Sequence, residues 1–131
     1  MAVLIAADDT VSWLLGLVLG LAMIAAAVAI IVINNGAASG RIGPNPGMGI
    51  RTAATRSSEE AWQAAHSAAG PVMQLAAVVS LATGVLVLFL RSSPNLFYGA
   101  LLVGALLLAV LSVVGAVVGD RAAKAVRDAA D

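Results

Sequence analysis

The sequence predicts an all-α membrane protein with three transmembrane helices, and three observations lead to that prediction. Apolar residues make up 61% of the chain and charged residues 11%, whereas a soluble domain has about half and about a quarter. The apolar residues gather in long runs at residues 11–33, 71–90 and 96–118. None of these runs contains a charged residue. We therefore expect residues 1–131 to form a single membrane domain.

The first run is long enough to span the bilayer, because a helix rises about 1.5 Å per residue and the hydrocarbon core is about 30 Å thick. The alternative is a cleaved signal peptide, since Ala25-Ala26-Ala27 resembles a small-residue cleavage site. A signal peptide begins with a basic segment. Residues 1–10 contain no Lys or Arg and do contain Asp8 and Asp9, so the sequence favours a retained span.

The second and third runs are separated only by residues 91–95, a link short enough to require an antiparallel hairpin. Backbone groups need internal partners in lipid, and the runs lack the alternating polarity of membrane strands, so both are expected to be helices. Residues 119–131 carry basic side chains at helical spacing. This tail is either a short helix along the membrane surface or a frayed end.

The orientation follows from the basic residues, because short loops rich in Lys and Arg stay in the cytoplasm. One side of the membrane receives six of them, namely Arg41, Arg51, Arg56, Arg121, Lys124 and Arg127. The other side receives only Arg91. We therefore expect the N-terminus outside, with the loop 34–70 and the tail 119–131 in the cytoplasm.

Two pairs of glycines lie four residues apart, Gly16 with Gly20 in the first apolar run and Gly115 with Gly119 at the end of the third. Small residues at this spacing let membrane helices approach closely. Each pair is a candidate packing face, either within the chain or between copies in a homo-oligomer. The sequence leaves that choice open.

The polar loop 34–70 carries the unusual composition of this chain. Asn34-Asn35-Gly36 is expected to end the first helix, and the segment 43–49 is dense in proline and glycine. Prolines fix φ and glycines allow positive φ, which predicts a shaped loop. Ser57 and Glu60 match a capping box and predict the start of a short interfacial helix.

That helix should place four side chains on one face, those of Glu59, Trp62, Gln63 and His66. It is expected to continue, kinked at Gly70-Pro71, into the second span. Trp62 would then lie near the membrane interface as an anchor, where its ring is buried and its N–H stays in a polar layer.

The loop also resembles a known family. An ordered set of residues resembles the signature of the SdpI family of small bacterial membrane proteins, namely Pro44-Asn45-Pro46, Gly49-Ile50-Arg51-Thr52, Thr55, Ser58, Glu59, Glu60, Trp62, His66 and Gly70. The resemblance implies a bacterial cytoplasmic membrane protein. The best-known member of that family gives immunity to a secreted peptide toxin and holds a transcriptional repressor at the membrane. This chain differs in having one three-span unit, Pro71 after Gly70, and Gly47 where a bulky residue is common.

Arg51 is the first candidate for binding, since a cation in a rigid loop can bind a carboxylate, a phosphate or a lipid headgroup. The alternative is a simple topology anchor. His66 and Glu59 could form a proton-sensitive pair or part of a metal site, but the sequence favours a simpler role, a hydrogen bond that fixes the loop against the helix. One histidine and no cysteine fall short of a zinc site, so no metal or cofactor is expected.

We therefore predict a non-enzymatic membrane protein that binds a partner through Asn45, Pro46, Gly49, Arg51, Thr52, Glu59, Trp62 and His66. The expected partners are membrane lipid and a peptide toxin, a transcriptional regulator or another membrane protein. Direct nucleic-acid binding is not expected, because seven basic and seven acidic residues cancel. The alternatives are an accessory subunit of a larger complex and, ranked last, a lipid enzyme using His66, Glu59 and Glu60.

Overall fold

The structure, a computed structural model, describes residues 11–131 and consists of three long helices. They are α2 (Trp13–Ala38), α3 (Glu59–Phe89) and α4 (Pro94–Ala130), and each is long and apolar enough to cross a membrane. The predicted all-α fold is thereby confirmed, with three helices that are long and apolar enough to span a membrane. The prediction that the first span is retained relied in part on Asp8 and Asp9, which lie outside the described residues.

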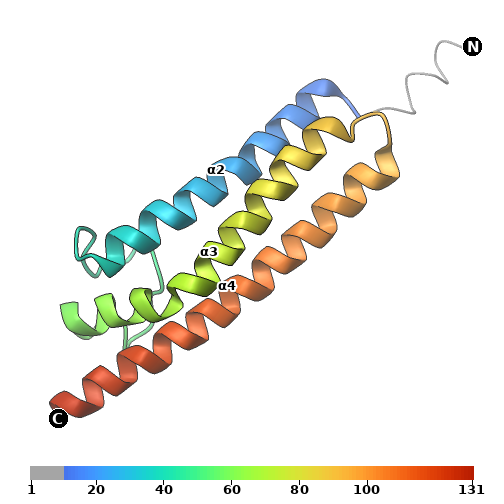
Figure 1. Cartoon of the computed structure of the whole chain (residues 1–131). Coiled ribbons are helices and arrows are strands. Elements are labelled where there is room, and N and C mark those ends of the chain that lie inside the picture. The colour runs from blue at the N-terminus through green and yellow to red at the C-terminus, as the bar shows by residue number, and fades with distance from the viewer. Residues whose placement is uncertain (1–10) are drawn as a thin grey trace, which may run out of the picture.

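The helix α3 lies between the other two and packs against both, as Figure 1 shows. Within the described residues the backbones of α2 and α4 do not approach each other, and the Phe97 side chain of α4 reaches Gly16 of α2 near the turn that contains Arg91. The loop 39–58 and the C-terminal end of α4 lie at the same end of the bundle, and the turn that contains Arg91 lies at the opposite end (Figure 1). Residues of the loop lie in the space between α2 and α4, beside α3.

The first helix is longer than predicted, because Asn34-Asn35-Gly36 does not end it. The helix continues to Ala38, and the backbone N–H of Ser39 donates to the Asn35 carbonyl at 3.0 Å. The chain then turns at Gly40, which has a φ of +80°, a conformation that glycine adopts readily and other residues rarely. Gly36 has a packing role instead, since a Cβ there would lie 2.7 Å from Ile42 Cδ1.

The predicted interfacial helix and the second span form one helix, α3, with Pro71 inside it. Figure 1 shows α3 changing direction between its green first part and its yellow-green remainder, as expected where proline removes a helical hydrogen bond. The predicted cap was wrong by one residue. The hydroxyl of Ser58 accepts from the Ala61 N–H at 3.0 Å, while Ser57 Oγ donates to the Ala54 carbonyl at 2.6 Å.

The tail 119–131 is neither a separate surface helix nor a frayed end, because α4 runs without a break to Ala130. An ion pair one turn apart, Lys124 to Asp120 at 2.7 Å, supports this extension. Ala123 is buried against the first turns of α3 and the loop. Packing against the loop thus extends the helix past the apolar run.

Both glycine pairs are used inside the chain. A Cβ at Gly84 of α3 would lie 2.7 Å from the Gly20 carbonyl oxygen of α2. A Cβ at Gly119 of α4 would lie 3.1 Å from the Ala65 carbonyl oxygen, and one at Gly115 would lie 2.6 Å from Met73 Sδ. Close approach of helix backbones replaces hydrophobic burial as the packing force in lipid.

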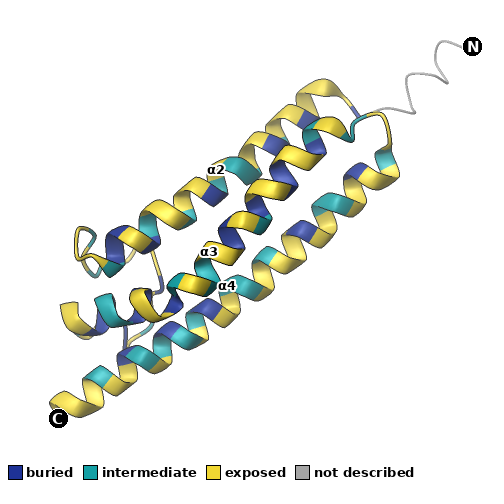
Figure 2. Cartoon of the chain, viewed as in Figure 1, coloured by how far each residue is buried: buried dark blue, intermediate teal, exposed yellow. Residues whose placement is uncertain are grey.

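The outward faces of all three helices are exposed and apolar, and Figure 2 shows the buried residues concentrated along α3. Phe89, for example, is 80% exposed. Apolar side chains on an outer surface are stable in lipid tails and costly in water. The fold is therefore that of a multi-pass membrane protein.

Candidate functional site

The loop 39–58, which we call the docked loop, is held against α3 by two aromatic side chains. Trp62 and His66 are 0% and 1% exposed, and their ring centroids are 4.4 Å apart. Trp62 Nε1 donates to the Ile42 carbonyl at 2.7 Å, and His66 Nε2 accepts from the Ile50 N–H at 2.9 Å. The indole is thus enclosed by protein, and the expectation of a Trp62 membrane anchor was wrong.

These contacts determine the protonation of His66. Because Nε2 accepts a backbone N–H, the ring proton lies on Nδ1, which donates to the Trp62 carbonyl at 2.8 Å. Burial lowers the pKa of His66 from its ordinary value, and the hydrogen bond to the Trp62 carbonyl opposes this only in part. The imidazole is therefore neutral, with both nitrogens committed to the backbone.

Gly49 allows the loop to approach this pair. Its φ is +85°, a conformation that side chains with Cβ rarely adopt. A Cβ there would lie 2.6 Å from His66 Nε2 and 3.1 Å from Trp62 Cη2. Glycine at this position is thus required by both the backbone and the packing.

Asn45 and Pro46 shape the exposed turn of the loop. Asn45 Oδ1 accepts from the N–H groups of Gly47 and Met48 at 2.9 and 2.8 Å, while its Nδ2 donates to the Gly43 carbonyl at 2.9 Å. The Pro46 carbonyl accepts a hydrogen bond from Arg51 Nη1. The turn therefore positions the Arg51 side chain, which remains exposed.

Thr52 connects the loop to α4. Its hydroxyl donates to Asp120 Oδ1 at 2.5 Å, and its N–H donates to Thr55 Oγ1 at 2.8 Å. The hydrogen bond from Lys124, with a smaller contribution from Thr52, lowers the pKa of Asp120. Sequence reasoning missed Asp120, although it is the first charged residue after the third apolar run.

Glu59 does not join the site. It is exposed in the first turn of α3, and within the described residues no hydrogen bond or ion pair connects it to His66. The alternative of a His66–Glu59 pair is thus not formed, because both ring nitrogens already have backbone partners. The favoured interpretation of His66, a hydrogen bond that fixes the loop against the helix, is confirmed. Residues 11–131 also contain no cluster of three or more metal-ligating side chains.

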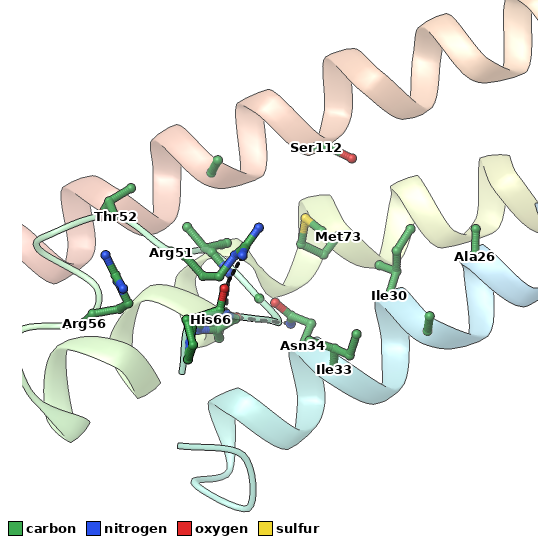
Figure 3. A pocket seen from close by; sticks show the side chains of 15 residues that line it. Ala26, Ile30, Ile33, Asn34, Arg51, Thr52, Arg56, His66, Met73 and Ser112 are labelled. Carbon is green, nitrogen blue, oxygen red and sulfur yellow. Dashed lines mark hydrogen bonds between the residues drawn. The ribbon is translucent and has the colours of Figure 1, made fainter. Parts of the chain in front are cut away.

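A pocket of about 650 Å³ opens beneath the docked loop, between α2 and α4. Figure 3 shows the pocket, with the side chains of Arg51, Arg56 and His66 at one end. The lining residues come from α2 (Ala26, Ala29, Ile30, Ile33, Asn34), the loop (Pro46, Gly49, Ile50, Arg51, Thr52, Arg56), α3 (His66, Met73) and α4 (Ser112, Ala116).

Asn34 is another residue whose role the sequence did not predict, since it was expected only to end a helix. It is 5% exposed, and its Nδ2 donates to the His66 carbonyl at 3.2 Å. Within residues 11–131 its Oδ1 is buried without a hydrogen-bond partner. The sequence did contain one indication of this role, since Asn34 is a polar residue directly after the first apolar run.

The fold and the site define a class of protein, a small multi-pass membrane protein whose polar loop is docked on its own helices. The family model for the SdpI/YfhL protein family matches residues 41–119. The chain belongs to the SdpI/YfhL protein family, as its loop motif predicted. No curated protein and no solved structure matches the chain.

Proposed function

We propose that this chain is a non-enzymatic protein of the bacterial cytoplasmic membrane that recognises a partner through the docked loop. Immunity to a membrane-active peptide toxin, coupled to signalling through a transcriptional regulator, is the specific role that its family suggests. The observation that carries the proposal is the arrangement of Arg51, whose exposed guanidinium is held by a loop fixed at Trp62, His66 and Thr52. A topology anchor needs no such support.

The chemistry of His66 supports a binding role over catalysis. A general base needs a free lone pair near the reacting proton. The Nε2 lone pair accepts the Ile50 N–H, and Nδ1 carries the proton. The Thr55 hydroxyl is likewise committed, donating to the Ile50 carbonyl at 2.7 Å. The polar side chains of the site thus maintain the loop's shape.

The cytoplasmic orientation of the loop is part of this proposal. The basic loop and the basic end of α4 lie together at one end of the bundle, and Arg91 lies at the other (Figure 1). Such an excess of Lys and Arg is typical of the cytoplasmic side. Cysteines introduced singly at Met48 and at Ser93, labelled from outside intact cells, test it: only the Ser93 position should react.

The role of the loop is tested by challenging a sensitive bacterium that produces the chain with the family's secreted peptide toxin. Arg51→Ala should lose protection, while Arg41→Ala, which changes an exposed arginine outside the pocket, should keep it. If Arg51→Ala and His66→Ala proteins, shown to be inserted and abundant, protected as well as wild type, the role of the loop in immunity would be refuted.

The alternative of an accessory subunit is not favoured by the glycine pairs suggested for docking. Gly20, Gly115 and Gly119 are covered by helices of the same chain. Purification in mild detergent still discriminates the two functions, because a stable stoichiometric protein partner would support a subunit. A monomer or a homo-oligomer would support a self-contained receptor.

A further inference from the structure

The polar end of the pocket beneath the docked loop combines positive charge with an unused acceptor. The side chains of Arg51 and Arg56 line it, and the ion pairs of residues 11–131 involve neither of them. Asn34 Oδ1 is buried without a partner, and the Asn34 side chain points into the pocket in Figure 3. This end therefore calls for an anion that also carries a hydrogen-bond donor.

The rest of the pocket is apolar except for Ser112 of α4. Ala26, Ala29, Ile30 and Ile33 of α2 face Met73 of α3 and Ala116 of α4 across it. From Asn34 to Ala26 the helix rises about 12 Å, close to the thickness of one hydrocarbon leaflet, about 15 Å. The apolar part thus matches the depth that an acyl chain occupies in one leaflet.

The pocket is also accessible from the membrane. Because the backbones of α2 and α4 do not approach each other in the described chain, the space between them at the docked loop is open to neighbouring lipid. Its volume of about 650 Å³ lies in the range of small-molecule sites, about 300–1,000 Å³. Basic pockets between membrane helices commonly bind anionic lipid headgroups.

We propose that this pocket is a binding site for an anionic phospholipid with a hydroxylated headgroup, of the phosphatidylglycerol type. The phosphate binds Arg51 and Arg56, a headgroup hydroxyl donates to Asn34 Oδ1, and one acyl chain lies between α2 and α4. Lipid binding here is independent of any role in immunity. Its test measures lipid retention and never protection, so each proposal can fail alone.

The test is native mass spectrometry of the full chain in mild detergent, titrated with phospholipids of identical acyl chains. Phosphatidylglycerol should bind at one site and more tightly than zwitterionic phosphatidylcholine. It should also bind about threefold to tenfold more tightly than phosphatidylmethanol, which has the same charge but no headgroup hydroxyl. The soluble headgroup, glycerophosphoglycerol, should not compete at the same concentrations, because it lacks the acyl chain.

Matched variants separate the parts of the site. Arg56→Gln should weaken phosphatidylglycerol binding about fivefold, and Arg56 makes no side-chain hydrogen bond within residues 11–131 whose loss would disturb the loop. Ala29→Phe should block the apolar part. Arg41→Gln and Ala25→Phe, at exposed positions outside the pocket, should bind like wild type.

Three results would overturn the proposal. The first is equal binding of phosphatidylglycerol and phosphatidylcholine to wild type. The second is undiminished binding by Arg56→Gln and Ala29→Phe, with folding of both variants verified by circular dichroism. The third is effective competition by glycerophosphoglycerol, which would mean that a free phosphate compound and not a lipid is the ligand.

Discussion

The Nε2 atom of His66 accepts a hydrogen bond from the backbone N–H of Ile50 at 2.9 Å, and this contact joins the docked loop to α3. A protonated imidazole cannot make it, because Nε2 would then be a donor facing another donor. The attachment of the loop therefore depends on the charge of one buried side chain outside the apolar spans.

Stability should accordingly fall in acid. Burial holds the pKa of His66 below its ordinary value of 6.5, so the unfolded chain takes up a proton before the folded chain does. The contribution is present above pH 6.5 and is lost as the pH falls through the folded-state pKa. Thermal unfolding in detergent between pH 7.5 and pH 5 should show a decreasing Tm. A His66→Gln protein should lack this part of the pH dependence, and an unchanged profile would contradict the prediction.

Replacing Gly49 by alanine should release the loop. The backbone at this position has a positive φ, which alanine disfavours, and the added Cβ would collide with the His66 ring. We expect a loss of about 1–3 kcal/mol in unfolding free energy. Gly43→Ala is the matched control, because its Cβ would have no neighbour within 4 Å. Denaturation of both variants in detergent, followed by Trp62 fluorescence in a Trp13→Phe background, checks the difference.

Removing the Thr52 hydroxyl should loosen the loop from α4. Thr52→Val deletes the hydrogen bond to Asp120 and the one that the hydroxyl accepts from the Thr55 N–H, whereas Thr52→Ser retains a hydroxyl that can make both. Hydrogen exchange at residues 50–55 should accelerate in the valine variant and stay near the wild-type rate in the serine variant. Equal exchange in all three proteins would show that these hydrogen bonds do not hold the loop.

A Cβ at Gly84 should separate α2 from α3. It would lie 2.7 Å from the Gly20 carbonyl oxygen, a backbone atom that cannot move aside as a side chain can. Gly84→Ala should therefore cost about 1–3 kcal/mol of unfolding free energy. Gly99→Ala on α4, where nothing lies within 4 Å of the new Cβ, should be tolerated. A comparison of the two Tm values in the same detergent decides the question.

The family and the three helices could be predicted from sequence because their signals are local. Long uncharged apolar runs need no distant partner to indicate a span, and the loop motif lies within residues 44–70. The kink at Pro71 was predicted for the same reason, since proline removes a hydrogen bond of its own helix. Helix ends were less predictable, because neighbouring residues compete for the cap, as Ser57 and Ser58 do here.

The candidate site depends on contacts that no local pattern contains. Asn34 meets His66 across 32 residues, and Thr52 meets Asp120 across 68. Trp62 was interpreted as a lipid anchor because nothing in the sequence near it indicates a partner for its indole N–H. That partner, the Ile42 carbonyl, lies 20 residues away.

By itself, the sequence determined the solvent of this protein, the number of its helices and its family, since hydropathy and motif order are properties of consecutive residues. Only the tertiary structure decided which polar groups are paired and where a pocket remains. Those outcomes depend on how closely the glycines let α2, α3 and α4 approach one another, which is a property of the packed chain.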